Sequence, residues 1–383
     1  METAESQLLD SGYWNDANPD LRLNPLVPFD DAGLEAFLAS AGELRGQVIF
    51  ATSGSSGAPK LVCVSKTALL ASAKAVNSHL RVTVDDRWLC ALPTFHVGGF
   101  GIWARAFAIG AEAIRYERSW DAQRFVQLCE TSEISLTSLV AVQVFDLVKA
   151  GLRCPERLRA VVVGGSALSE ELGLAAQKLG WPLLQSFGMT ESSSQIATQP
   201  LESVESPHKN AELPILPCWE TRVNAESLLE IRGAPLFSAY LESRSGTWQL
   251  DFPFSEDGWF TTRDRVLLSA TTLTPLGRGG RTVKILGELV NLDRLEQLLF
   301  EAGDQFSDRI ALETKPDPRI GEKLVLVVEP SVPESEASQI RNSFDQCVAP
   351  FERIQEIAKI EAIPRSPLGK IQRRRLRELL SVV

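Results

Sequence analysis

Short apolar, β-branched runs alternate with amphipathic stretches from about residue 48 to residue 185. The strand-like runs are Val48–Ala51, Leu61–Val64, Trp88–Leu92, Ala113–Ile114, Ile134–Leu136, Ala160–Val163 and Leu183–Gln185. Between them, apolar residues recur at the spacing of one helix face, as in Lys66–Leu80. Strands that alternate with helices in this way predict an α/β large domain with a mostly parallel, helix-covered sheet.

Three serines stand where helix N-caps are expected. Ser65 precedes the predicted helix 66–80, Ser138 the helix 140–149, and Ser169 the helix that reaches Leu179. Residues 1 to about 45 carry several prolines and one helical patch, so we expect a peripheral lead-in.

The pattern changes near residue 211, where Pro, Gly and Trp recur between short strand-like runs. This texture predicts a β-rich subdomain over about 211–276, within a large domain of residues 1–278. The glycine-rich stretch Gly277–Arg281 indicates a hinge. We expect residues 279–383 to form a small, mobile α+β domain.

Composition narrows the function. The chain has 383 residues, a net charge of -10 and a pI of about 5.1, which argue against nucleic-acid binding. Its six cysteines show no zinc or redox spacing. The start, Met1–Glu5, is acidic, unlike a signal peptide. The apolar region 97–114 contains Arg105 and Glu112, so we expect a buried helix and strand rather than a membrane span, and a cytoplasmic protein.

A loop rich in Gly and Ser lies between the first two strand-like runs. Its phosphate-binding candidates are Thr52, Ser53, Gly54, Ser55, Ser56, Gly57 and Lys60. Glycines let successive N–H groups face one concavity, the hydroxyls add donors, and Lys60 adds positive charge. A proline precedes the lysine and a strand follows it, so this is not a Walker A loop. The alternative is that this Gly- and Ser-rich loop is a flexible linker.

Two further motifs follow neighbouring strands, at the sheet edge where α/β proteins bind ligands. The first is Gly164, Gly165, Ser166 and Ala167, and the second is Phe187, Gly188, Met189, Thr190 and Glu191. The glycines let a flat ring approach, Phe187 can stack on a base, Thr190 can bind a phosphate oxygen, and Glu191 can hold Mg²⁺. The alternatives are a tight turn and a solvent-exposed carboxylate.

Together the TSGSSGAPK loop and the aromatic-G-x-T-E motif resemble the adenylate-forming superfamily of acyl-CoA ligases, luciferases and peptide-synthetase adenylation domains. Residues 257–264 are similar to its G-W-[FY]-x-T-G-D motif, which implies that Asp264 binds the ribose; Arg263 replaces the usual glycine. Residues 277–287 resemble its hinge motif, which implies nucleotide contacts from Arg278 and Lys284, with Gly280 in place of the hinge acid.

Near the C-terminus, residues 364–371 resemble the superfamily's P-x-[ST]-x-x-G-K-[IL] motif, which implies that Lys370 is catalytic. Alternatively, Lys370 belongs to a solvated basic helix face that continues through Arg373 and Arg377. Residues 92–99 resemble the family's L-P-x-F-H-x-x-G, which places His96 at the acid pocket, although a histidine at a strand end is the competing interpretation.

Residues 188–195 resemble the G-M-T-E-T-x-S-Q of o-succinylbenzoate–CoA ligases of menaquinone biosynthesis, which places Ser192 and Ser194 at the acid. The resemblance implies an ATP-dependent acid–CoA ligase that forms an acyl-AMP intermediate and uses ATP, Mg²⁺, CoA and a small carboxylic acid. Another aryl- or fatty-acyl-CoA ligase, an enzyme loading a carrier protein, and a non-catalytic nucleotide-binding relative remain alternatives. The sequence leaves monomer or homodimer open.

Overall fold

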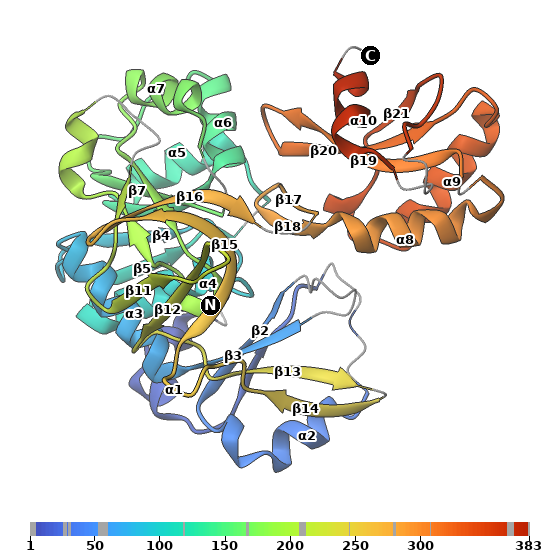
Figure 1. Ribbon diagram of the computed structural model, residues 1–383. Coiled ribbons are helices and arrows are strands. Elements are labelled where there is room, and N and C mark those ends of the chain that lie inside the picture. The colour runs from blue at the N-terminus through green and yellow to red at the C-terminus, as the bar shows by residue number, and fades with distance from the viewer. Residues whose placement is uncertain are drawn as a thin grey trace. The chain divides into compact units, whose positions relative to one another are not determined.

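The computed structural model describes residues 5–25, 29, 32–52, 60–117, 119–165, 168–206, 212–244, 246–278, 281–306, 308–365 and 371–381. The chain forms two compact units (Figure 1). The larger comprises Met1–Asn24, Phe29–Thr52 and Pro59–Gly279, and the smaller is built on Gly280–Val383.

A six-stranded sheet in the larger unit carries the predicted strand–helix alternation. Its order is β5 (Glu112–Arg115), β4 (Arg87–Cys90), β6 (Leu136–Val140), β7 (Ala160–Gly164), β8 (Leu183–Phe187) and β9 (Ala197–Thr198). Every pairing is parallel except that of β8 with β9. Its helices are α3 (Lys66–His79), α4 (Val97–Ile109), α5 (Ala122–Thr131), α6 (Ala141–Lys149) and α7 (Glu170–Lys178). The α/β prediction is confirmed.

Two of the three expected helix caps are present. Ser65 accepts from the N–H of Ala68, and Ser169 from the N–H of Leu172. The cap expected at Ser138 is wrong, because Ser138 lies inside β6 and the helix begins later, at Ala141. There the Gln143 side chain accepts a 3.0 Å hydrogen bond from the backbone N–H of Val140.

A second five-stranded sheet holds the ends of the predicted phosphate loop. Its order is β1 (Asp20–Arg22), β2 (Gln47–Thr52), β3 (Lys60–Ser65), β13 (Ala239–Arg244) and β14 (Thr247–Asp251). The β2 and β3 strands are antiparallel, as expected for strand, loop, strand. The β3 strand also pairs with β13, so a hairpin from the expected β-rich region completes this sheet.

The other strands of that region form an antiparallel sheet in the order β10 (Leu213–Pro214), β16 (Thr272–Arg278), β15 (Phe260–Leu268), β12 (Leu228–Gly233) and β11 (Trp219–Val223). The region is therefore β-rich as predicted, but its strands are shared between two sheets. One main core runs through the larger unit and includes Trp88, Phe100 and Leu229.

The expectation of a peripheral N-terminal lead-in is wrong for its first part. Leu8 in the 3₁₀ turn Ser6–Leu9 and Trp14 in α1 (Ser11–Asn15) are buried in the main core. The indole N–H of Trp14 donates a 2.8 Å hydrogen bond to the carbonyl of Leu8. The α2 helix (Leu34–Ser40) covers the second sheet through buried Leu34. Prolines misled the prediction, since they lie between these elements.

The smaller unit is an α+β fold. Its sheet has the order β18 (Glu288–Asn291), β17 (Thr282–Ile285), β20 (Gly321–Val328) and β19 (Ile310–Asp317), and β21 (Glu356–Lys359) pairs with β20. Its helices are α8 (Leu292–Ala302), α9 (Glu334–Gln346) and α10 (Arg373–Leu380). Within the described ranges, no helix of either unit is both long enough and apolar enough to span a membrane.

Candidate active site

The two predicted nucleotide motifs end neighbouring parallel strands. The β7 strand ends at Gly164 and the β8 strand at Phe187, and the pair Val163–Gln185 sets their register. Gly165 and Phe187 therefore lie at the same carboxyl edge of the sheet. Phe187 is half-buried and packs against the main core. Ser166 and Ala167 lie outside the described residues.

Gly188 is required by a close backbone approach just after β8. A Cβ atom at this position would lie 1.6 Å from the carbonyl oxygen of Ser194, so no other residue fits. The loop closes where the N–H of Ile196 donates a 2.8 Å hydrogen bond to the carbonyl of Phe187. This fold-back holds the 3₁₀ turn Thr190–Ser192, which carries the predicted phosphate and metal residues Thr190 and Glu191.

The two predicted substrate serines have different surroundings. Ser192 is fully buried, and its hydroxyl bonds the backbone of Met189 and the carbonyl of Ser194. It thus stabilises the loop. Ser194 has a φ of 121° and accepts a 3.2 Å hydrogen bond from Nη2 of Arg105. The arrangement directs only Ser194 toward a neighbouring cation.

Glu191 and Lys60 meet through a residue that the sequence did not single out. The hydroxyl of Tyr240 on β13 donates a 2.8 Å hydrogen bond to Oε1 of Glu191. The N–H of Phe237 donates to the Glu191 carbonyl at 2.9 Å. Nζ of Lys60 lies 3.5 Å from the centre of the Tyr240 ring, a cation–π contact. The sheet β1-β2-β3-β13-β14, called here the hairpin sheet, thereby connects Lys60 at the end of the phosphate loop to Glu191, the predicted metal residue.

The mouth of the phosphate loop is fixed by its two end residues. Thr52 pairs with Lys60 in the strand register, and its hydroxyl donates a 3.0 Å hydrogen bond to the Lys60 carbonyl. Lys60 also forms a 2.9 Å ion pair with Glu242. Burial acts to raise the pKa of Glu242, but the hydrogen bond and charge of Lys60 outweigh it and lower this pKa. Ser53, Gly54, Ser55, Ser56 and Gly57 lie outside the described residues.

Arg105 is a fully buried cation in α4, and its side chain is 2% exposed. Its guanidinium donates to the hydroxyls of Ser138 (3.4 Å) and Ser194 (3.2 Å), and lies 5.5 Å from the Trp88 ring centre. Burial lowers the pKa of Arg105 to about 10. No carboxylate of the described chain forms an ion pair with it. A buried charge without a counter-ion is costly, so this position favours an anionic ligand.

Sequence reasoning missed Arg105 as a site residue, although a signal was present. It is the single charged residue in an otherwise apolar helix, Val97–Ile109. His96 immediately precedes that helix, is half-buried, and lies 4.5 Å from the Phe95 ring centre. In the same motif, a Cβ atom on Gly99 would lie 2.3 Å from the carbonyl oxygen of Pro93, which explains the glycine of L-P-x-F-H-x-x-G.

The predicted ribose residues lie on paired strands. Asp264 on β15 is buried and stands opposite Arg278 on β16. The hydroxyl of Thr262 accepts a 3.1 Å hydrogen bond from the N–H of Asp264. Arg263, which replaces the usual glycine, lies in β15 where its register with β12 shifts between Leu228 and Glu230, and it has no positive φ. An arginine therefore fits this backbone without strain.

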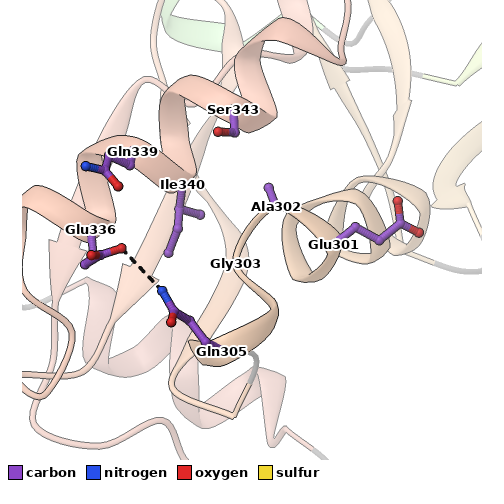
Figure 2. Close-up of a pocket in the computed structure, with 8 residues that line it drawn as sticks. All are labelled: Glu301, Ala302, Gly303, Gln305, Glu336, Gln339, Ile340 and Ser343. Atoms are coloured by element: carbon purple, nitrogen blue, oxygen red, sulfur yellow. Dashed lines mark hydrogen bonds between the residues drawn. The ribbon is translucent and has the colours of Figure 1, made fainter.

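The remaining candidates belong to the smaller unit. Lys284 lies on β17 and is exposed. Lys370 lies outside the described residues. A hollow of about 370 Å³ in this unit is lined by the end of α8 and by α9 (Figure 2). Its polar lining includes Glu301, Glu336 and Ser343, and it contains none of the predicted site residues.

The model of the AMP-binding enzyme family matches residues 47–240. A 2-succinylbenzoate–CoA ligase of Listeria monocytogenes serotype 4b (strain F2365) is 30% identical over 339 residues, which are 87% of this chain and 70% of that protein.

The chain belongs to the AMP-binding enzyme family.

The resemblance to adenylate-forming enzymes is thus confirmed. A 2-succinylbenzoate–CoA ligase of Enterococcus faecalis is also similar, with 27% identity over 85% of this chain and 68% of its own. The fold matches that of o-succinylbenzoate CoA synthetase from Bacillus subtilis, a double mutant solved with a product analogue. Its TM-score is 0.73, with 23% identity over 86% of this chain and 69% of that one.

Proposed function

We propose that this AMP-binding enzyme is an ATP-dependent acid–CoA ligase that acts on 2-succinylbenzoate through an acyl-AMP intermediate. The observation that carries the proposal is Arg105, a buried guanidinium that meets only hydroxyls and an aromatic ring among the described residues. The named relatives supply the acid. 2-Succinylbenzoate has two carboxylates: one is activated, and the other keeps its charge through the reaction.

Arg105 and Ser194 suit that second carboxylate. A guanidinium offers a planar fork of donors, and a charge-assisted pair is strong where water is excluded. A fatty acid or a simple benzoate has one carboxylate only, and using it at Arg105 would leave none at the reacting centre. In this proposal His96 lies near the reacting carboxylate, and Arg105 sets the specificity.

The first step joins the acid to the nucleotide. An oxygen of the succinyl carboxylate attacks the α-phosphorus of ATP, the bond to the bridging oxygen breaks, and pyrophosphate leaves. We assign the phosphates to the loop from Thr52 to Lys60 and to Thr190, the base to Gly164, Gly165 and Phe187, and the ribose to Asp264 and Arg278. Lys370 neutralises the charge that develops on the α-phosphate. The CoA thiol then attacks the acyl carbon and AMP leaves.

Glu191 suits a magnesium ion. Tyr240 occupies one of its carboxylate oxygens with a single hydrogen bond, so acceptor capacity remains. The described chain holds no group of three or more His, Cys, Asp and Glu side chains that could bind a metal. One carboxylate with substrate phosphates and water is the usual magnesium shell, whereas a dedicated protein cage is not needed. Bound there, Mg²⁺ would neutralise phosphate charge.

A substrate comparison tests the proposal. We expect pyrophosphate release and CoA thioester formation with 2-succinylbenzoate, and much lower kcat/KM with 4-oxo-4-phenylbutanoate, which lacks only the ring carboxylate. Equal kcat/KM for the two acids, or a preference for a medium-chain fatty acid, would remove the substrate assignment while keeping the family. Acyl transfer to a carrier protein in place of CoA would support the loading enzyme instead, and the absence of pyrophosphate release with any acid would support a non-catalytic relative.

A further inference from the structure

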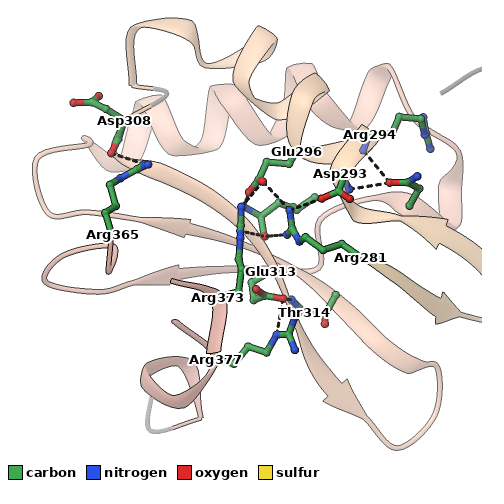
Figure 3. Close-up of polar contacts among 12 residues, drawn as sticks. Arg281, Asp293, Arg294, Glu296, Asp308, Glu313, Thr314, Arg365, Arg373 and Arg377 are labelled. Carbon is green, nitrogen blue, oxygen red and sulfur yellow. Dashed lines mark hydrogen bonds and ion pairs between the residues drawn. The ribbon is translucent and has the colours of Figure 1, made fainter. Parts of the chain in front are cut away.

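Glu296 on α8 connects two arginines that are far apart in sequence (Figure 3). Its Oε2 accepts a 2.7 Å hydrogen bond from Nη1 of Arg281 and another from Nη2 of Arg373. Arg281 is the last residue of the glycine-rich stretch 277–281 that we interpret as the hinge. Arg373 begins α10, three positions after Lys370. The carboxylate is 10% exposed, so water screens these contacts little.

Both arginines also bind the backbone of Leu312, in the middle of β19. The Leu312 carbonyl accepts from Nη2 of Arg281 at 2.9 Å and from Nη1 of Arg373 at 3.1 Å. Its N–H donates to Oε1 of Glu296 at 3.1 Å. Each guanidinium therefore bridges the same carboxylate and the same carbonyl. We call Arg281, Glu296, Arg373 and the Leu312 peptide groups the arginine clamp.

The residues on either side of the Lys370 segment are also tied together. Arg365 and Ile371 form an antiparallel bridge, and the N–H of Gln372 donates a 2.7 Å hydrogen bond to the carbonyl of Pro364. Arg365 donates to the carbonyl of Asp308 at 2.9 Å. The clamp begins only two residues after Ile371, so it fixes the point at which the chain leaves Lys370.

We propose that Glu296 and Arg373 are positioning residues for Lys370: through the arginine clamp they hold the chain after the lysine in one register with Arg281, the last residue of the hinge stretch. The role rests on the adenylation chemistry proposed above. A lysine at the end of a movable domain neutralises the α-phosphate only if it arrives at a defined place. The clamp ties Arg281 and Arg373 to the same carboxylate and the same carbonyl, so these two residues keep one register.

The adjacent Arg374 offers a matched control. Its side chain is 95% exposed and, among the described residues, pairs only with Glu378, one turn along the same helix. The variants Arg373→Gln and Arg374→Gln make the same charge change one residue apart. For Glu296→Gln the control is Glu352→Gln, because Glu352 pairs with Arg294 in the same domain and is also buried.

The test measures the two half-reactions separately in the full-length protein. We expect Arg373→Gln and Glu296→Gln to lower acid-dependent pyrophosphate release about 10- to 100-fold, the range for a misplaced catalytic group. Conversion of supplied acyl-AMP and CoA to thioester should remain unchanged, and both control variants should keep both activities. Arg373→Lys keeps the charge, loses the paired contacts and covers the case in which Arg373→Gln fails to fold.

A second readout does not depend on activity. Hydrogen–deuterium exchange should be faster in peptides around Leu312 and Ile371 in Arg373→Gln than in Arg374→Gln. Equal exchange in the two variants, or an equal loss of both half-reactions in Arg373→Gln, would overturn the positioning role. If the wild type adenylates no acid while the exchange difference is present, the proposed function fails and the clamp itself stands.

Discussion

The hydroxyl of Tyr240 lies 2.8 Å from Oε1 of Glu191 and donates a hydrogen bond to it. The two residues come from different sheets: Glu191 follows a strand of the parallel sheet, and Tyr240 lies on the hairpin sheet that also carries Lys60. The ring of Tyr240 lies under the ammonium of Lys60 while its hydroxyl orients the carboxylate. One side chain therefore aligns a positive and a negative group that we assign to the same polyphosphate.

Tyr240→Phe separates these two contacts, since it removes the hydroxyl that bonds Glu191 and keeps the ring that contacts Lys60. A hydrogen bond to a charged group contributes about 1.5–3 kcal/mol. We expect the variant to fold and to need a higher Mg²⁺ concentration for half-maximal pyrophosphate release, with an unchanged KM for the acid. A magnesium titration of initial rates measures this. An unchanged magnesium requirement would show that the hydroxyl does not orient Glu191 for the metal.

Glu191→Ala should abolish most magnesium-dependent adenylation and leave the fold intact, because the side chain lies on a loop and is half-buried. Circular dichroism and pyrophosphate release, measured on the same sample, test both parts. Glu202→Ala is a control, since Glu202 pairs with Arg81 on the surface with a side chain that is 59% exposed. Normal pyrophosphate release by Glu191→Ala would exclude Glu191 from the site.

Arg105→Met should lower the activity with 2-succinylbenzoate without lowering the stability of the fold. A buried charge without a counter-ion is costly, so an apolar side chain of similar length should not lower the free energy of unfolding. The same change should raise the KM for 2-succinylbenzoate about 10- to 100-fold through the lost charge-assisted contact. With 4-oxo-4-phenylbutanoate, the variant and the wild type should behave alike. If Arg105→Met unfolds at a lower temperature and affects both acids equally, Arg105 is structural.

Lys370→Ala should lose adenylation by about two or more orders of magnitude, the range for one preorganised charge at a transition state. It should still convert supplied acyl-AMP and CoA to thioester, because we expect the small domain to rotate between the two steps. Separate assays of the half-reactions distinguish these outcomes. An equal loss in both would mean that Lys370 is structural or that the domain does not alternate.

Asp86 should make the free energy of unfolding depend on pH. Burial acts to raise its pKa, but hydrogen bonds from Arg159, the N–H of Thr83 and Ser135 outweigh it and lower the pKa to about 2. The folded pKa lies below the unfolded value of about 3.9, so this stabilisation is present above pH 4 and is lost as the pH falls toward 2. Urea unfolding should show wild type more stable than Asp86→Asn at pH 7, with a gap that narrows below pH 4. A gap independent of pH would contradict the assignment.

Local signals predicted local structure well. Ser65 and Ser169 cap their helices because a hydroxyl beside free N–H groups needs no help from the rest of the chain. The motif residues at the ends of β7 and β8 meet because parallel neighbours end at one edge. Ser138 failed as a cap because β6 extends through it, and its pairing with β7 comes from tertiary structure.

Residues joined across the fold could not be predicted. Tyr240 approaches Glu191 only because β13 pairs with β3, and no spacing in the sequence encodes that pairing. The basic run from Lys370 to Arg377 allows the alternative of a solvated helix face that includes Arg373, yet Arg373 bonds Glu296 while its neighbour Arg374 is exposed. From the sequence alone, Arg105 is a charge that argues against a membrane span. Its role as a candidate anion site follows from its surroundings in the folded chain, where no carboxylate of the described residues pairs with it.

The pairing of β3 with β13 also bears on how the protein acquires its site during synthesis. The strands that flank the phosphate loop emerge early from the ribosome. The edge of β3 that includes Cys63 stays unpaired until Ala239 and the rest of β13 have been synthesised. Long-range strand pairing is slow, and an open edge invites association with other chains. A nascent chain that ends before β13 can form the parallel sheet, yet it exposes that edge and has no Tyr240 to orient Glu191.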